Sequence, residues 1–419
     1  MLFRHIYVHI PFCQRRCSYC DFNTFANSEM FMESYCTALA RHIRAMGQGK
    51  WAPEAGLRIA PEVLSPPSPY ERRDVPGPLR RDDLPATVFL GGGTPTALPL
   101  HLLELVLRAC DDVMPLATAE VTSEANPGTV LNEDYLRGLR SLGVNRLSLG
   151  VQSLDDQVLR MLGRIHTAAE ARESYEAARR AGFETINLDF IFGLPGQTLE
   201  QWRASLEEIV TWGVDHFSLY SLILEEGTPL AAQVAAGRVC VPDEDQTAAM
   251  YELAIDVLGA AGYIQYEISN WALPGNGPIV GRDVLPAHAA RHNVAYWLNA
   301  DYLGCGAGAH SHARRRRWSD LRALAMYIGA VREGRPPVDE VITLTGRDIE
   351  AETMFMGLRL NTGVGEAHFR ERCGRSLDEA WGSELHELVE LGLVERDQQA
   401  VRLTYRGRLL GNTVFERFV

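Results

Sequence analysis

The sequence predicts an α/β protein whose strands form an open or partial barrel, followed by a small α+β domain. Short apolar segments alternate with longer helical segments through the first half of the chain, which indicates parallel strands joined by right-handed crossovers. Six such strands suit a (β/α)6 arrangement related to the TIM barrel, with function at the carboxyl ends of the strands. Beyond about Pro337 the pattern changes to closely spaced helices with two short strands.

The expected strands are short apolar segments: Ile6–Ile10, Thr87–Leu90, Glu120–Glu124, Arg146–Gly150, Thr185–Ile191 and His216–Leu224. The helices expected between them are Ser28–Met46, Leu100–Asp111, Asn132–Leu142, Thr167–Ala181 and Leu199–Thr211. Two of these helices start at residues that favour N-caps. Asn132 precedes an acidic first turn, and Thr167 stands three residues before Glu170, which is capping-box spacing.

We predict two domains, residues 1–336 and residues 337–419. Residues 47–85 are rich in Pro, Gly, Arg and Asp without a sustained period, which predicts a flexible surface insertion. A second Gly- and Pro-containing loop spans residues 275–290. The last domain is predicted to be winged-helix-like, because helices precede two short strands near Leu393–Arg396 and Ala400–Leu403.

The composition is that of a globular protein, with 46% hydrophobic and 23% charged residues among 419. A net charge of −13 argues against nonspecific nucleic-acid binding as the main activity. The basic run 314–317 is expected to be a solvated turn, with a carboxylate-bearing ligand as the alternative. The eight cysteines do not form a disulfide framework, which predicts a reducing compartment. We find neither a signal peptide nor an apolar segment of ~18 residues, so we expect a cytoplasmic protein.

Three cysteines near the N-terminus form a C-x3-C-x2-C triplet, Cys13, Cys17 and Cys20. Three thiolates can hold three irons of a 4Fe–4S cluster and leave the fourth iron open to a chelating ligand. The alternative is structural zinc, which usually closes at four ligands. No further Cys or His follows within a few residues to close the set, so the triplet favours the cluster.

Polar residues and glycines follow several of the expected strands. The run Gly91–Pro95 directly follows one strand, where glycines let the backbone approach a ligand; a tight turn is the alternative. Glu124 ends the next strand and Gln152 follows the fourth, while Arg164 lies beyond it and Asp189 lies within the fifth. Each alone is more often an ordinary structural residue, but together they place polar groups at one rim.

Several long motifs occur in an order that resembles one family. They are Tyr7–Cys13, the cysteine triplet, Gly91–Pro95, Asn187–Gly196 and Arg291–Trp297. The chain resembles the HemW-type haem chaperones, radical S-adenosylmethionine (SAM) relatives of the oxygen-independent coproporphyrinogen III oxidase. The resemblance covers nearly the whole chain except residues 47–85 and part of residues 275–290. It implies the radical-SAM partial barrel.

The resemblance implies site residues one by one. Cys13, Cys17 and Cys20 would hold the cluster, whose open iron would bind the amino and carboxylate groups of adenosylmethionine. The positions implied to line adenosylmethionine are Tyr7, Tyr19, Gly92, Gly93, Thr94 and Glu124. The positions implied to contact a second such molecule are Gln152, Arg164 and Asp189. An electron from the reduced cluster would then break a carbon–sulfur bond of the cofactor.

The haem expectation rests on the motif His292-Asn-x-x-Tyr296-Trp297. A neutral imidazole is a good axial ligand for haem iron, and the two aromatic rings can pack against the macrocycle. A structural histidine beside a buried aromatic pair is the alternative from the residues alone, and the family resemblance favours haem. His310 and His312 are rival ligands.

The resemblance implies a chaperone that delivers haem to a respiratory haem protein. The oxidase pattern has a further cysteine two residues after the triplet, where this chain has Phe22, so the chaperone branch is favoured. The alternatives are coproporphyrinogen oxidation or another radical SAM reaction, and, more distantly, a redox-sensing DNA-binding regulator. Interleaved acidic residues in the last domain disfavour nucleic-acid recognition. A homodimer and a membrane contact through the client stay open.

Overall fold

The computed structural model describes residues 3–51, 84–130, 132–275 and 285–419. Its main sheet has the strand order β11-β1-β4-β5-β6-β7-β8-β10-β9. The six central strands are parallel and confirm all six expected strands: β1 (His5–Ile10), β4 (Thr87–Gly92), β5 (Glu120–Ala125), β6 (Arg146–Gln152), β7 (Thr185–Phe192) and β8 (His216–Ser221). Three further strands were not expected: β9 (Ile264–Glu267), β10 (Asn270–Ala272) and β11 (Leu303–Cys305).

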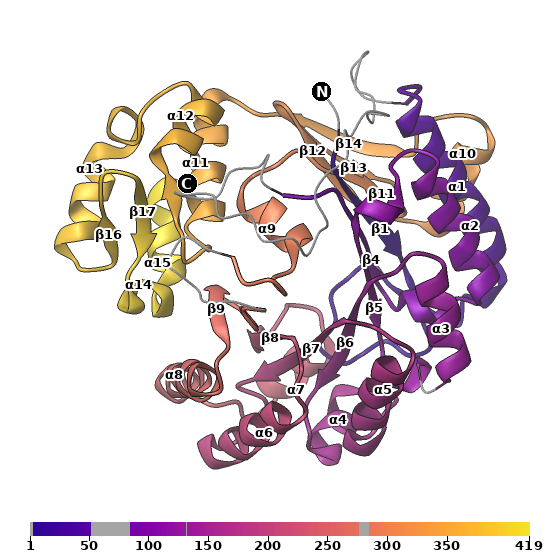
Figure 1. Cartoon of the computed structure of the whole chain (residues 1–419), viewed down its shortest axis with the longest axis horizontal. Helices are drawn as coiled ribbons and strands as arrows, with labels where there is room; N and C mark the ends of the chain where they lie inside the picture. Colours follow the sequence, from indigo (N-terminus) through magenta and orange to yellow (C-terminus); the bar gives the residue numbers. More distant parts are fainter. Residues whose placement is uncertain (1–2, 52–83, 131, 276–284) are drawn as a thin grey trace.

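Helices cover the convex face of this curved sheet (Figure 1). They are α1 (Met32–Gly47), α2 (Leu100–Asp111), α3 (Glu133–Ser141), α4 (Asp156–Leu162), α5 (Ala168–Arg180) and α6 (Leu199–Thr211). The first begins four residues later than expected, because a 3₁₀ turn precedes it at Glu29–Phe31. Asn132 caps α3, and Thr167 forms the expected capping box with Glu170. Beyond β8 follow α7 (Pro229–Ala235) and α8 (Glu244–Ala260).

Strand residues alternate between the two faces of the sheet. On β1, Ile6, Val8 and Ile10 join the apolar core that also contains the buried residues of α1 and α2. The intervening side chains of β1 are polar, as in His5 and Tyr7, and the concave face also carries the hydrogen-bonded polar side chains of Thr87, Ser148, Asn187 and Ser218. The concave face is therefore unusually rich in polar side chains for a barrel interior.

The short helix α9 (Arg291–Trp297) lies on the concave side (Figure 1). Its His292 backbone N–H donates to Glu120 Oε1 at 3.1 Å, and Arg146 Nη1 donates to the carbonyl of His288 at 2.8 Å. Glu120 and Arg146 are the first residues of their strands. The helix α9 and the residues before it therefore cover the amino-terminal end of the sheet, opposite the edge where function was expected.

The chain then forms the antiparallel sheet β12 (His310–Ala313), β13 (Arg316–Asp320) and β14 (Val338–Thr343), with α10 (Leu324–Arg332) between β13 and β14. The C-terminal part has its own core. It contains α11 (Gly346–Gly357), β15 (Val364–Gly365), α12 (Glu366–Cys373), α13 (Leu377–Glu390), β16 (Val394–Arg396), β17 (Ala400–Leu403), α14 (Tyr405–Leu409) and α15 (Gly411–Phe415).

Both expected C-terminal strands are present as β16 and β17. The domain division after residue 336 stays a prediction. Strand β14 lies beyond this boundary but pairs with β13, which lies before it. Most of the expected insertion 47–85 lies outside the described residues, as does the middle of the loop 275–290. In the parts of the chain that the structure describes, no helix combines the length and the apolar character needed to cross a bilayer.

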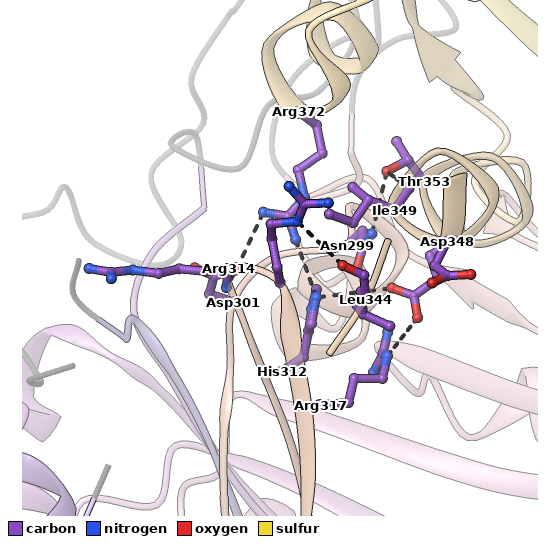
Figure 2. A network of polar contacts seen from close by, with 12 residues as sticks. Asn299, Asp301, His312, Arg314, Arg317, Leu344, Asp348, Ile349, Thr353 and Arg372 are labelled. Carbon is purple, nitrogen blue, oxygen red and sulfur yellow. Dashed lines mark hydrogen bonds and ion pairs between the residues drawn. The ribbon is translucent and has the colours of Figure 1, made fainter. Parts of the chain in front are cut away.

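A polar network joins the C-terminal part to the rest of the chain (Figure 2). Arg317 Nε donates to Glu352 Oε1 of α11 at 2.7 Å, and Arg372 Nη1 of α12 lies 3.4 Å from Asp301 Oδ1. His312 lies between them, with its Nε2 3.3 Å from Arg372 Nη2 and 4.0 Å from Glu352 Oε2. These largely buried charges fix the C-terminal part against β12, β13 and the segment after α9.

Candidate functional site

The cysteine triplet lies at the carboxyl edge of the sheet. Cys13 ends the short strand β2 (Phe12–Cys13), which pairs with β3 (Phe25–Ala26). Ser18, between the other two cysteines, donates its N–H to Leu162 O at 2.9 Å, and its carbonyl accepts from Leu230 N at 2.9 Å. The loop is thus attached to the end of α4 and the start of α7. All three cysteines are free and partly exposed.

Three cysteines in one short loop form a donor set that fits a 4Fe–4S cluster, in which each thiolate binds a different iron. Arg164 Nη1 donates to Cys17 Sγ at 3.4 Å and Thr94 Oγ1 donates to Cys13 Sγ at 3.7 Å, contacts that suit bound thiolates.

Burial raises the pKa of two of the three thiols in this loop. It raises the pKa of Cys13 to about 11, with the Thr94 hydroxyl acting in the opposite direction. Burial also raises the pKa of Cys20. The free thiols of Cys13 and Cys20 are therefore protonated near neutral pH, and a bound iron would supply the positive charge that deprotonates them.

The three glycines at the end of β4, Gly91 to Gly93, each stand where a side chain would collide. A Cβ on Gly91 would lie 2.9 Å from Glu124 Oε2, and one on Gly93 would lie 2.7 Å from the carbonyl oxygen of Phe12. Gly92 has φ +106°, and its Cβ would overlap the ring of His9. Hydrogen bonds from Gly93 N to Ile10 O at 2.9 Å and from Thr94 N to Phe12 O at 2.8 Å hold the run against the cysteine segment. The glycines therefore fix the backbone that leads into Cys13, the first residue of the triplet.

The carboxyl group of Glu124 lies next to this run, and that of Asp189 lies close enough to Glu124 for its charge to act on it. Gly92 N–H donates to Glu124 Oε2 at 3.0 Å, while Asp189 accepts from Asn187 Nδ2 at 2.8 Å and Ser148 Oγ at 2.9 Å. Burial, and next the charge of Asp189, raises the pKa of Glu124 to about 8. Burial likewise raises the pKa of Asp189. The Glu124 carboxyl therefore gains and loses its proton at a pH close to neutral, as groups at functional sites often do.

Gln152 and Arg164 meet above Gly150. A Cβ on Gly150 would lie 2.9 Å from Gln152 Nε2 and 3.2 Å from Arg164 Nη2. Gln152 has φ +69°, in the left-handed region, at an irregularity of the β6–β7 pairing. Such strain is concentrated at functional sites. Arg164 Nε is buried and has no hydrogen-bond partner among the described residues, so it can donate to a ligand.

The two tyrosines flank the same edge. Tyr7 donates to or accepts from His9 Nδ1 at 3.0 Å, and burial followed by the charge of Glu124 raises its pKa. Tyr19 packs on the apolar cluster of Leu162 and Leu230 beneath the cysteine loop. The structure thus brings twelve of the thirteen sequence-predicted site residues to one edge.

The thirteenth residue, His292, lies at the opposite end of the concave face. Its ring is 1% exposed, with Nδ1 2.7 Å from Thr87 Oγ1 and Nε2 3.0 Å from the Tyr296 hydroxyl. Burial holds its pKa well below the ordinary value, so it is a neutral imidazole, the form that binds iron. Of its rivals, His310 is exposed and His312 is buried in the polar network of Figure 2.

Several polar residues that support the site were not singled out from the sequence. Asn187 Oδ1 accepts a hydrogen bond from His216 Nδ1 at 2.6 Å, and Asn187 Nδ2 donates to Asp189 and so orients it. The hydroxyl of Thr87 contacts His292. The two-residue period of a strand could have identified Asn187, because it lies on the same face of β7 as Asp189. That period does not predict which residues of distant strands contact it.

Two family models match the chain. Residues 7–209 match the Radical SAM superfamily, and residues 344–410 match the HemN C-terminal domain. The structure is similar to that of coproporphyrinogen III oxidase (HemN) from Escherichia coli, with a TM-score of 0.77 at 23% identity, covering 100% of this chain and 90% of that one. The expected radical-SAM α/β fold with a small C-terminal domain is confirmed.

Relatives match over the full length. "Heme chaperone HemW" of Bacillus subtilis (strain 168) is 35% identical over 415 residues, covering 99% of this chain and 98% of its own. The protein of that name from Lactococcus lactis subsp. lactis (strain IL1403) is 33% identical, covering 99% and 96%. "Radical S-adenosyl methionine domain-containing protein 1, mitochondrial" of Mus musculus is 33% identical, covering 96% and 84%. The chain belongs to the HemW family of haem chaperones within the radical SAM superfamily.

Proposed function

We propose that this protein is cytoplasmic, binds haem and delivers it to a respiratory haem protein. The observation that carries the proposal is the full-length match to relatives named as haem chaperones. Phe22, where the oxidase pattern has a cysteine, agrees with it. The motif that would hold haem is His292 to Trp297, whose Trp297 Nε1 is buried without a hydrogen-bond partner among the described residues.

The proposal also gives a cofactor-binding role to the residues at the carboxyl edge of the sheet. Cys13, Cys17 and Cys20 would hold a 4Fe–4S cluster, and adenosylmethionine would bind beside the glycine run. Glu124 would accept a hydrogen bond from an ammonium or ribose hydroxyl, while Arg164 and Asp189 would contact a second cofactor molecule. When bound, the cluster supplies the electron that cleaves adenosylmethionine.

Oxidation of coproporphyrinogen III is the second candidate, because the complete set of rim residues would serve an enzyme equally well. An anaerobic assay with the reconstituted protein, coproporphyrinogen III and adenosylmethionine separates the two, run beside a haem titration. We expect stoichiometric haem binding without porphyrin formation. Turnover with consumption of adenosylmethionine would favour the enzyme instead.

The cluster assignment has its own test. Reconstituted protein should bind about four irons per chain. The Cys13→Ala, Cys17→Ala, Cys20→Ala triple variant should bind almost none, whereas Cys110→Ala, at a buried cysteine on α2, should keep them. Iron retained by the triple variant would refute the assignment.

A further inference from the structure

The imidazole of His292 belongs to a buried chain of hydrogen bonds. Its Nδ1 lies 2.7 Å from Thr87 Oγ1, and the same hydroxyl lies 3.0 Å from Nδ1 of His5. His5 and Thr87 face one another in the β1–β4 register. His292 reaches this pair from α9, some 200 residues later in the sequence. All three groups are buried, so water does not compete for these bonds.

Two arrangements of the hydrogens let His292, Thr87 and His5 form both of these hydrogen bonds. In one, His292 Nδ1–H donates to Thr87, whose hydroxyl donates to His5 Nδ1. In the other, His5 Nδ1–H donates to Thr87, whose hydroxyl donates to His292 Nδ1. Only the first arrangement leaves Nε2 of His292 with a free electron pair, which iron requires. Burial lowers the pKa of His5 to about 3, so His5 is neutral and can accept the hydroxyl hydrogen.

Tyr296 occupies the other nitrogen. Its hydroxyl lies 3.0 Å from His292 Nε2, and the two rings meet edge to face with centroids 4.8 Å apart. Whereas His292 is buried, the Tyr296 side chain is partly exposed. A hydroxyl that donates to Nε2 fits the first arrangement and holds the position that a metal would take.

We propose that Thr87 and His5 position His292 as the ligand of haem iron, and that the Tyr296 hydroxyl occupies Nε2 until haem displaces it. This inference rests on the proposed haem binding and names residues that act on that site. Thr87 and His5 are positioning residues, since they touch the ligand histidine and not the iron. The Tyr296 hydroxyl would compete with haem iron for Nε2 of His292.

The test compares haem titrations of the wild type and four variants. Thr87→Val keeps the shape and removes the hydroxyl, so haem binding should weaken about 10- to 100-fold, the usual effect of losing a partner of a metal-bound histidine. The Soret band should shift as well. Tyr296→Phe keeps the ring and removes the competing hydroxyl, so binding should tighten about 2- to 10-fold, the value of one hydrogen bond.

Thr185→Val is the matched control. Thr185 Oγ1 lies 3.1 Å from His288 Nδ1, the same kind of contact at the start of another strand, but it does not touch His292. Its haem affinity and spectrum should stay those of the wild type. Thr87→Ser restores the hydroxyl and should recover binding, which separates loss of the hydrogen bond from failure to fold.

A second readout needs no haem. Nitrogen-15 NMR of the ligand-free chain should show His292 with a hydrogen on Nδ1 and none on Nε2. A hydrogen on Nε2, or unchanged haem binding in both Thr87→Val and Tyr296→Phe, would overturn the inference while leaving haem binding intact. Absence of haem binding by the wild type would instead overturn the proposed function.

Discussion

At the scale of single residues, Arg164 brings a positive charge to a predicted cluster ligand. Its Nη1 donates to Cys17 Sγ at 3.4 Å. Reduction adds negative charge to a cluster, so a nearby cation raises the reduction potential. We expect Arg164→Met to lower the midpoint potential by about 60 mV, a factor of ten for one electron. A redox titration monitored by EPR measures this. Arg160→Met, at an exposed position of α4, should leave the potential unchanged; equal potentials for both variants would contradict the account.

Glu124 gives a prediction in pH. Its pKa is raised from 4.5 to about 8, chiefly by burial. Between these values the folded chain holds a proton that the unfolded chain releases, so this carboxyl destabilises the fold increasingly as pH rises through that window. Glu124→Gln removes the penalty. Relative to the wild type, its free energy of unfolding should increase by about 2 kcal/mol between pH 6 and pH 8, because each pKa unit of linkage is worth about 1.4 kcal/mol.

Urea unfolding of the ligand-free protein at the two pH values measures this difference. Glu33→Gln, at an exposed position of α1, is the control and should show no such change. A constant difference between Glu124→Gln and the wild type from pH 6 to pH 8 would show that Glu124 ionises in the folded chain as it does in water.

At the scale of elements, the turn after β4 and the cysteine segment depend on each other. A Cβ on Gly93 would meet three backbone atoms of residues 10–12 at 2.7–2.9 Å, and backbone cannot move aside as a side chain can. Gly93→Ala should cost about 1–3 kcal/mol in unfolding free energy and reduce the iron content after reconstitution. Gly259→Ala, in α8 with open space around it, should be neutral or stabilising by up to about 1 kcal/mol. Full iron content in Gly93→Ala would contradict this role.

The elements differ in how well the sequence predicts them. The strand beginning at Thr185 and the helix beginning after Thr167 were predictable, because apolar period and capping signals are local. The cysteine spacing is likewise local, and the three residues that it predicts as cluster ligands lie in one short loop. The position of α9 was not predictable: its contacts with Glu120 and Thr87 join segments about 170 to 200 residues apart. Strand β10 was missed because three residues carry too little period to detect.

At the scale of the whole molecule, the polar network of Figure 2 connects the C-terminal part to the segment that follows α9. Glu352, 13% exposed, receives Arg317 at 2.7 Å and lies near His312. Glu352→Ala leaves both without this carboxylate, and should cost about 1–3 kcal/mol. Urea unfolding and limited proteolysis between β14 and α11 measure the effect. Glu340→Ala, at an exposed position of β14, is the control; equal stability of both variants would show that the network does not hold the interface.

Transfer of haem tests the central proposal, that this molecule is a haem chaperone, most directly. Haem-loaded protein is mixed in a stopped-flow instrument with membrane vesicles that contain a haem-free respiratory cytochrome, and separately with apomyoglobin as a scavenger of released haem. Handover through contact predicts a transfer rate to the cytochrome that rises with its concentration and exceeds the rate of release to apomyoglobin. A rate that is independent of cytochrome concentration and equal to the rate of release would contradict the proposal, because haem would then reach the cytochrome only by dissociating into solution.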